Sequence, residues 1–149
     1  MEPINLSGYI DALGKVQKLY GKSLEPVCKK WTLTRNELDV MLFLFNNPQF
    51  DRAADIVSRR GIAKSHVSLS VSALERRGML QREFSVKDRR MAHLTLTERG
   101  QEAAMEGRNT QERFFLALCG DIPLEELTQW QNTANKLRDN IEKIEPETR

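Results

Sequence analysis

Cysteine and histidine are scarce in this chain, with two of each among 149 residues. Cys28 and Cys119 lie far apart and match no metal-ligand spacing, so we expect two reduced thiols and no metal site. The chain also lacks the GxSxG and HExxH motifs, and Ala63 replaces the glycine that a phosphate-binding loop places before its lysine. These absences predict a protein that is not an enzyme and needs no cofactor.

Long apolar runs are absent as well, because no stretch approaches the roughly 18 residues that span a bilayer. The first ten residues mix Glu2, Asn5 and Ser7 with apolar side chains and lack the basic start of a signal peptide. We therefore expect a cytoplasmic protein without a membrane partner. The length of 149 residues, of which 40% are hydrophobic, suits a single globular domain with its own core.

Charge is distributed unevenly along the chain, although the formal net charge is only +2. Residues 52–93 hold ten Lys or Arg and four Asp or Glu, which gives a net charge of +6. Residues 1–51 hold six of each sign, and residues 94–149 hold seven cations and eleven acids, net −4. A basic segment between neutral and acidic ends indicates a surface for one positioned anionic partner.

The centre of this basic segment, residues 62–77, is predicted to form a short helix that Gly78 ends. Val67, Val71 and Leu74 have the spacing of one apolar stripe with a 3.6-residue period. The other faces of this helix carry small hydroxyls and cations. Such a helix can approach a polyanion closely and donate hydrogen bonds to it, as a helix that reads the major groove of DNA must do.

A second, shorter helix is predicted just before it, over residues 53–59. Asp51 is expected to cap this helix, with Ala54 and Val57 facing inward. Gly61 then turns the chain into the next helix. Two short helices joined through a glycine turn, the second with exposed polar residues, predict a helix-turn-helix.

After Gly78 the apolar period changes to two, which predicts strands over residues 80–84 and 91–96. The connecting tip is basic and consists of Lys87, Asp88, Arg89 and Arg90. A hairpin directly behind a recognition helix is a wing. Thr97 is expected to cap the helix that follows.

Amphipathic helices are predicted on both sides of this part, over residues 4–31, 35–46, 98–118 and 124–144. Pro26 makes a bend or break in the first of them conceivable. Thr34 and Glu37 form a capping box that starts the second. The apolar face of the first helix is broader than a small core needs, which indicates a partner. Residues 145–149 are expected to fray.

The order of elements and several residues resemble the MarR family of winged helix-turn-helix transcription regulators. The resemblance spans about residues 31–100 and is carried by Leu33, Thr34, Ile62, Lys64, Ser65, Val67, Ser68, Val71, Leu74, Glu75, Gly78, Asp88, Arg89, Arg90, Leu94, Leu96, Thr97 and Gly100. Ala63 departs from the pattern, since many relatives carry a Ser or Asp cap there. The fold it implies is mainly α with a small β wing: residues 33–100 would bind DNA, and residues 1–31 and 101–145 would form dimerisation helices of one chain domain.

The resemblance also implies a homodimer that binds double-stranded DNA at a pseudo-palindromic site. By the family pattern, Asp88 orients an arginine of the wing tip, and Arg89 or Arg90 enters the minor groove, where negative potential is concentrated. The predicted DNA-binding residues are Lys64, Ser65, His66, Ser68, Leu69, Ser72, Arg76, Lys87, Asp88, Arg89 and Arg90. The alternative is a solvated surface, with Arg76 and Arg77 paired to Glu75.

A small aromatic effector is a further expected partner, in a pocket between the dimerising helices and the DNA-binding part. Tyr9, Tyr20 and Trp31 are candidates to line this pocket, although each is equally compatible with a core position. Cys28 and Cys119 could sense oxidants, but a cysteine on an apolar helical face usually acts as a small hydrophobe. The sequence thus predicts a homodimeric repressor that an effector releases; the alternative is a winged-helix module that binds protein.

Overall fold

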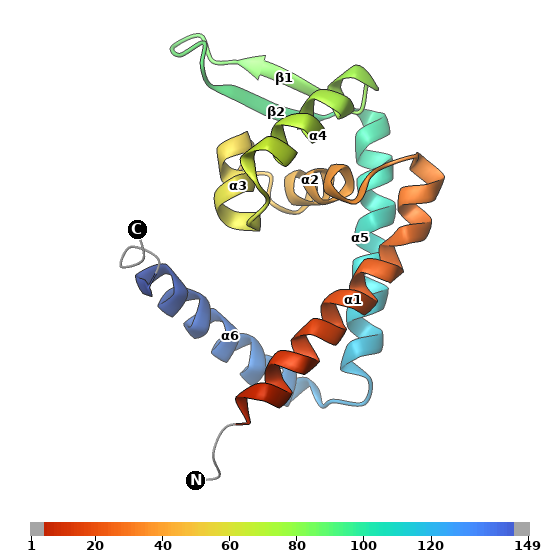
Figure 1. Cartoon of the computed structure of the whole chain (residues 1–149), viewed down its shortest axis with the longest axis vertical. Coiled ribbons are helices and arrows are strands. Elements are labelled where there is room, and N and C mark those ends of the chain that lie inside the picture. Colours follow the sequence, from red (N-terminus) through yellow and green to blue (C-terminus); the bar gives the residue numbers. More distant parts are fainter. Residues whose placement is uncertain (1–4, 145–149) are drawn as a thin grey trace. The chain divides into compact units, whose positions relative to one another are not determined.

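The computed structural model describes residues 5–144; residues 1–4 and 145–149, including the tail expected to fray, lie outside the described residues. The elements in chain order are α1 (Leu6–Trp31), α2 (Arg35–Asn46), α3 (Ala53–Arg60), α4 (Lys64–Arg76), β1 (Leu80–Phe84), β2 (Ala92–Leu96), α5 (Glu98–Cys119) and α6 (Leu124–Ile144) (Figure 1). The predicted fold class, mainly α with a small β wing, is confirmed.

The helices and strands begin and end close to the predicted positions. Thr34 and Glu37 form the predicted capping box of α2: the Thr34 hydroxyl accepts the Glu37 backbone N–H, and the Glu37 carboxylate accepts the Thr34 backbone N–H at 2.9 Å. The two strands pair antiparallel, with Leu80 opposite Leu96 and Phe84 opposite Ala92. α1 runs without a break through Pro26, so the break that this proline made conceivable does not occur.

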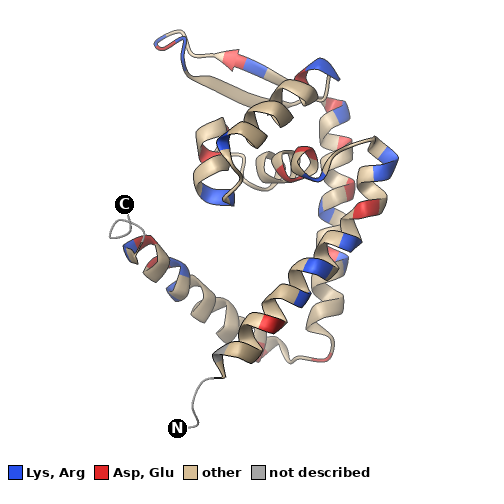
Figure 2. Ribbon diagram, viewed as in Figure 1, with Lys and Arg blue, Asp and Glu red and all other residues tan. Residues whose placement is uncertain are grey.

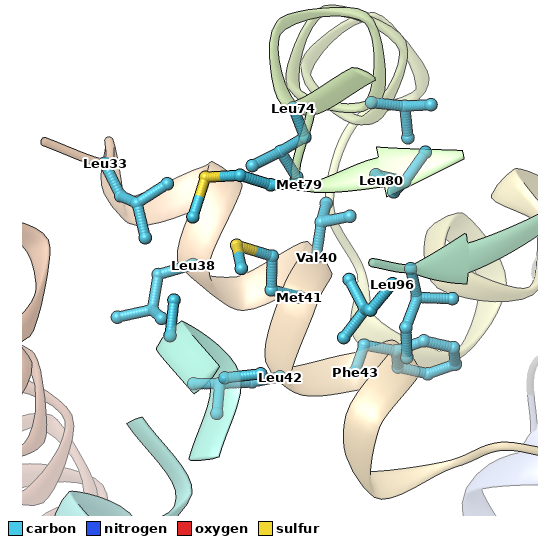
Figure 3. Close-up of a cluster of buried hydrophobic side chains, with 14 of the residues drawn as sticks. Leu33, Leu38, Val40, Met41, Leu42, Phe43, Leu74, Met79, Leu80 and Leu96 are labelled. Atoms are coloured by element: carbon cyan, nitrogen blue, oxygen red, sulfur yellow. The ribbon is translucent and has the colours of Figure 1, made fainter. Parts of the chain in front are cut away.

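α2 lies at the centre of the hydrophobic core of residues 5–114 (Figure 3). Leu38, Met41 and Leu42 are buried, whereas Phe45 is only half-buried. The recognition helix α4 contributes Val67, Val71 and Leu74, and the hairpin contributes Leu80, Leu94 and Leu96. Since α4 and both strands pack on the same core, the wing is held next to the recognition helix.

Asp51 does not cap α3, so this prediction is wrong. Arg52 occupies the N-cap position, and Asp55 Oδ2 accepts the Arg52 backbone N–H at 3.2 Å. The side chain of Asp51 instead contacts His93 on β2. The sequence offers two acids four residues apart, and the one inside the first turn makes the reciprocal bond of a capping box.

The inward face of α3 also differs in part from the prediction. Val57 packs against the core, but Ala54 is exposed and the fully buried residue is Ile56. Ala54 lies two residues, or about 200° around the helix, from Ile56, so the two side chains point in nearly opposite directions. The buried face of this short helix is therefore rotated by part of a turn from the predicted one, and Val57 belongs to both.

The junction of the wing with α5 requires glycine at position 100. A Cβ atom there would lie 2.0 Å from the Met79 backbone oxygen. Thr97 caps α5 as predicted, because its Oγ1 accepts the Gly100 backbone N–H at 3.2 Å and donates to the Gly78 carbonyl at 2.7 Å. The chain thus passes from β2 into α5 in direct contact with the backbone that leaves α4.

The chain divides into two compact units, and the division falls inside α5, between Phe114 and Phe115. In the second unit, α6 has no buried residue, and its apolar residues Leu124, Trp130, Leu137 and Ile141 are all exposed. Within residues 5–144, no helix is long and apolar enough to cross a membrane. The same residues contain no cluster of three or more His, Cys, Asp or Glu side chains that could hold a metal ion.

Candidate nucleic-acid interface

The outer face of α4 presents the predicted DNA-binding side chains. Lys64, Ser65, His66, Ser68, Leu69 and Arg76 are exposed, and Ser72 is half-buried. Leu69 stands out, because an apolar side chain at the centre of this polar face is 69% exposed. A face of hydroxyls, one aliphatic group and cations provides both donors and an apolar contact for base edges, of which the thymine methyl is one.

The N-terminus of α4 carries no side-chain cap. Ala63 occupies the N-cap position and makes no capping hydrogen bond, as the departure from the family pattern predicts. Gly61, with φ +70°, ends α3 and provides the left-handed turn between the two helices. α3 and α4 therefore form the predicted helix-turn-helix (Figure 1), and the first residues of α4, Lys64 and Ser65, are exposed.

Arg77, directly after α4, has a structural role. Its Nη2 donates to the Trp31 backbone carbonyl at 2.6 Å, and its Nη1 lies 3.4 Å from the Glu37 carboxylate. The alternative that Arg77 pairs with Glu75 is therefore wrong. This arginine links the ends of α1 and α4 to the start of α2.

The wing tip is organised by Asp88, although differently from the family pattern. Its Oδ1 accepts the Arg90 backbone N–H at 2.9 Å, and its carbonyl accepts the Met91 N–H at 3.0 Å. Among residues 5–144 no ion pair joins Asp88 to an arginine. The carboxylate thus folds the turn through the backbone, and the guanidinium groups of Arg89 and Arg90 stay exposed.

The base of the wing is fastened to the helix-turn-helix by Asp51. Its backbone carbonyl accepts the Leu94 N–H at 2.7 Å, and both its carboxylate oxygens lie 2.9 Å from His93 Nδ1. The sequence carries no signal for this contact, because the two residues are 42 positions apart and neither stands in a recognisable motif. The pair fixes β2 to the residue that precedes α3.

Lys and Arg residues occur on α3, α4 and the wing (Figure 2). Among the described residues, no ion pair involves Lys64, Arg76, Lys87, Arg89 or Arg90. Three further arginines, one at the N-cap of α3 and two in its last turn, were not among the predicted site residues, and each has an intramolecular partner. Arg52 pairs with Asp55 at 3.5 Å, Arg60 pairs with Asp39 at 3.6 Å, and the Arg59 guanidinium lies 3.6 Å from the Phe50 ring centroid.

The structure does not bring Tyr9, Tyr20 and Trp31 into one pocket. They are spaced eleven residues apart on α1, which at 1.5 Å per residue separates successive side chains by about 16 Å along the helix. Tyr20 has the richest surroundings: its hydroxyl accepts from Gln111 Nε2 at 2.5 Å, and the Arg35 guanidinium lies 5.0 Å from its ring centroid. Tyr20 thus has defined polar and cationic neighbours, and the three side chains lie on successive parts of α1.

The two cysteines are free thiols, as expected. Burial raises the pKa of the Cys28 thiol, and the nearby Arg35 guanidinium only partly opposes this effect. A raised pKa lowers the fraction of thiolate, the form that reacts with oxidants. The surroundings of Cys28 therefore disfavour thiol sensing at this residue.

A helix-turn-helix followed by a two-stranded basic hairpin defines a winged helix-turn-helix protein. Residues 31–91 match the model of the MarR family. Together with the fold, this match supports a MarR-family winged helix-turn-helix regulator, and the family and fold are those of transcriptional regulators.

Three known proteins illustrate the similarity. The uncharacterised HTH-type transcriptional regulator YdgJ of Bacillus subtilis is 23% identical over 113 residues, which are 76% of this chain and 68% of YdgJ. A MarR-family protein of Listeria monocytogenes, solved with a 26mer DNA, has a TM-score of 0.77 at 18% identity, covering 95% of this chain and 90% of its own. Bordetella bronchiseptica BpsR, whose DNA binding is regulated by 6-hydroxynicotinic acid, has a TM-score of 0.68 at 19% identity, covering 90% and 99%.

Proposed function

We propose that this chain binds double-stranded DNA as a homodimer and represses transcription from a pseudo-palindromic operator in the cytoplasm. The observation that carries the proposal is the set of five exposed, unpaired cations on α4 and the wing, beside the hydroxyl-rich face of α4. DNA affinity depends mainly on cations that neutralise phosphates, and specificity on side chains that reach base edges. The Listeria relative solved with DNA supports the same partner.

In this proposal α4 enters the major groove. Ser65, Ser68 and Ser72, with His66 and Leu69, would contact bases or phosphates, and Lys64 and Arg76 would contact phosphates. Lys87, Arg89 and Arg90 would contact the backbone or the adjacent minor groove, with Asp88 holding the turn.

Homodimerisation is supported by apolar surface outside the winged part. The α6 helix of 21 residues buries no side chain, although Leu124 is 79% and Trp130 60% exposed. On α1, Tyr9, Ile10 and Leu13 are likewise exposed. Exposed apolar side chains along a helix are characteristic of protein interfaces. A second copy that covers these helices would make residues 1–31 and 101–145 the dimerisation part.

An effector that releases the DNA is part of the proposal, and the regulation of BpsR by 6-hydroxynicotinic acid supports it. Of the three predicted lining residues, Tyr20 remains the best candidate, because it offers an aromatic ring beside the Arg35 cation. The effector must bind the DNA-competent and DNA-incompetent dimers with different affinity. Addition of a small panel of aromatic carboxylates to the preformed complex is expected to release the duplex, and Tyr20→Leu to abolish the release.

A winged-helix module that binds protein is the second candidate function. The wing residues Phe84 and Val86 are 57% and 101% exposed, which favours it. Selection of binding sites from a pool of random duplexes distinguishes the two. Enrichment of a palindromic site supports the regulator, and the absence of any enriched duplex supports the protein-binding module.

A further inference from the structure

Arg82 joins the wing to the DNA-facing side of the recognition helix. It lies on β1, opposite Leu94, and its side chain reaches two residues of α4. Nη2 donates to the Ser72 hydroxyl oxygen at 2.8 Å, and the buried Nε lies 3.1 Å from Glu75 Oε2. The Arg82 side chain is 28% exposed, so this guanidinium is held between the two elements and does not extend into solvent.

The hydrogen bond from Arg82 determines the direction in which the Ser72 hydroxyl can donate its own proton. A guanidinium has only donors, whereas a hydroxyl has one proton and two lone pairs, so Ser72 must accept. Its proton then points away from the cation. On α4, Ser72 adjoins Ser68, Leu69 and Arg76, three or four residues away and all exposed. The free proton of Ser72 therefore lies beside the surface that would face DNA.

The same guanidinium also neutralises the acid of this face. Glu75 is 44% exposed and is the only acidic residue of α4. A bare carboxylate there would repel DNA phosphates. With Arg82 Nε at 3.1 Å, the carboxylate belongs to an ion pair of zero net charge.

We propose that Arg82 is a positioning residue that orients the Ser72 hydroxyl so that its proton is directed to DNA, and that it cancels the charge of Glu75. This inference rests on the proposed DNA binding. The acceptor on the DNA is a phosphate oxygen or an acceptor atom of a base edge, such as purine N7, guanine O6 or thymine O4.

The test compares four variants on the duplex selected by the full-length protein: Ser72→Ala, Arg82→Met, Arg82→Met with Glu75→Gln, and all three changes together. Ser72→Ala is expected to weaken binding about three- to tenfold, as the loss of one hydrogen bond. Arg82→Met is expected to weaken DNA binding more, since this substitution also leaves the Glu75 carboxylate without its ion pair. Adding Glu75→Gln removes the repulsion and should restore affinity to the level of Ser72→Ala. Adding Ser72→Ala to that double variant should change affinity less than twofold.

Two controls accompany these measurements. Glu83→Gln removes an exposed acid of β1 that has no ion pair among the described residues, and should not compensate Arg82→Met. Thermal melting and sedimentation of each variant show whether it remains folded with the wild-type mass. The acceptor is identified by measuring the affinity that Ser72→Ala loses on duplexes of different sequence. If the acceptor is a base edge, the loss depends on the base pair at one position of the site. If the acceptor is a phosphate, the loss is the same for all duplexes.

The proposal would be overturned if Ser72→Ala still weakened DNA binding three- to tenfold in the variant that carries Arg82→Met and Glu75→Gln. The effects of Ser72 and Arg82 on affinity would then be independent. Wild-type affinity of folded Ser72→Ala, in a protein that otherwise binds its selected duplex, would also overturn it. If the wild-type protein selects no duplex, the proposed function itself is wrong. These results are distinguishable, because the last one is seen before any variant is made.

Discussion

The salt dependence of DNA binding is the most direct test of the wing. Five exposed cations per chain form no ion pair among residues 5–144: Lys64, Arg76, Lys87, Arg89 and Arg90. A homodimer carries each of them twice, so full engagement neutralises ten phosphates. Since each phosphate contributes about −0.9 to the slope of log K against log salt concentration, we expect a wild-type slope of about −9.

Arg89→Ala removes two of these contacts per dimer and should make the slope shallower by about 1.8, to about −7. Between 50 and 200 mM salt, the wild-type protein should then lose about tenfold more affinity than the variant loses, by the same relation. The assay is fluorescence anisotropy of the selected duplex, labelled at one end, at four or more salt concentrations. The substitution is at an exposed tip residue and should leave the free energy of unfolding nearly unchanged.

Lys22→Ala is the matched control, because it removes an exposed, unpaired cation from α1, far along the chain from the wing. Its slope should equal that of the wild type. An Arg89→Ala slope and affinity that coincide with those of Lys22→Ala would refute contact between this wing residue and DNA.

Four further predictions concern the fold and its assembly. Gly100→Ala forces a Cβ to within 2.0 Å of a backbone oxygen, and should lower the free energy of unfolding in urea by about 2–3 kcal/mol. His93→Ala breaks the pair with Asp51, in which both side chains are about two-fifths exposed; it should lower stability by less than about 1 kcal/mol but speed amide hydrogen exchange in β2. Because the pKa of Cys28 is raised, iodoacetamide at pH 8 should alkylate it more slowly than a free thiol, and an equal or faster rate contradicts this. Trp130→Glu places a charge on the apolar face of α6, and should shift the sedimentation mass at micromolar concentration from dimer to monomer, whereas a monomeric wild type would exclude the dimer.

Local signals in the sequence predicted most of the fold. The capping box of Thr34 and Glu37, the spacing of Val67 and Val71, and the change to a period of two after Gly78 each depend on residues within a few positions of one another. Such signals involve only the geometry of one helix or hairpin. For that reason the recognition helix and the wing could be located before any tertiary contact was known.

The partners of charged side chains could not be predicted in the same way. Arg77 donates to Trp31, 46 positions away, and Asp51 contacts His93 across 42 positions. The residue types show only that these groups need partners, and the packing of the helices decides which partner lies within reach. The candidate pocket residues are a related case: helical periodicity places Tyr9 and Trp31 on one face of α1 but gives no weight to their separation along the axis, so the sequence does not show whether they share a pocket.

The charges of residues 52–93 show how much the tertiary structure changes a count made from sequence. That count is +6, but Arg60 and Arg77 pair with Asp39 and Glu37 from outside the segment, which lowers the segment's unpaired net charge by two, to +4. Two of the four acids, Asp55 and Glu75, are themselves neutralised by arginines of the segment. The cations left without an acidic partner are concentrated on α4 and the wing tip, and only Arg59 lies elsewhere. The structure therefore lowers the total charge and at the same time concentrates what remains on the elements that would meet DNA, so the distribution of unpaired cations is a better predictor of the contact surface than the net charge of the segment.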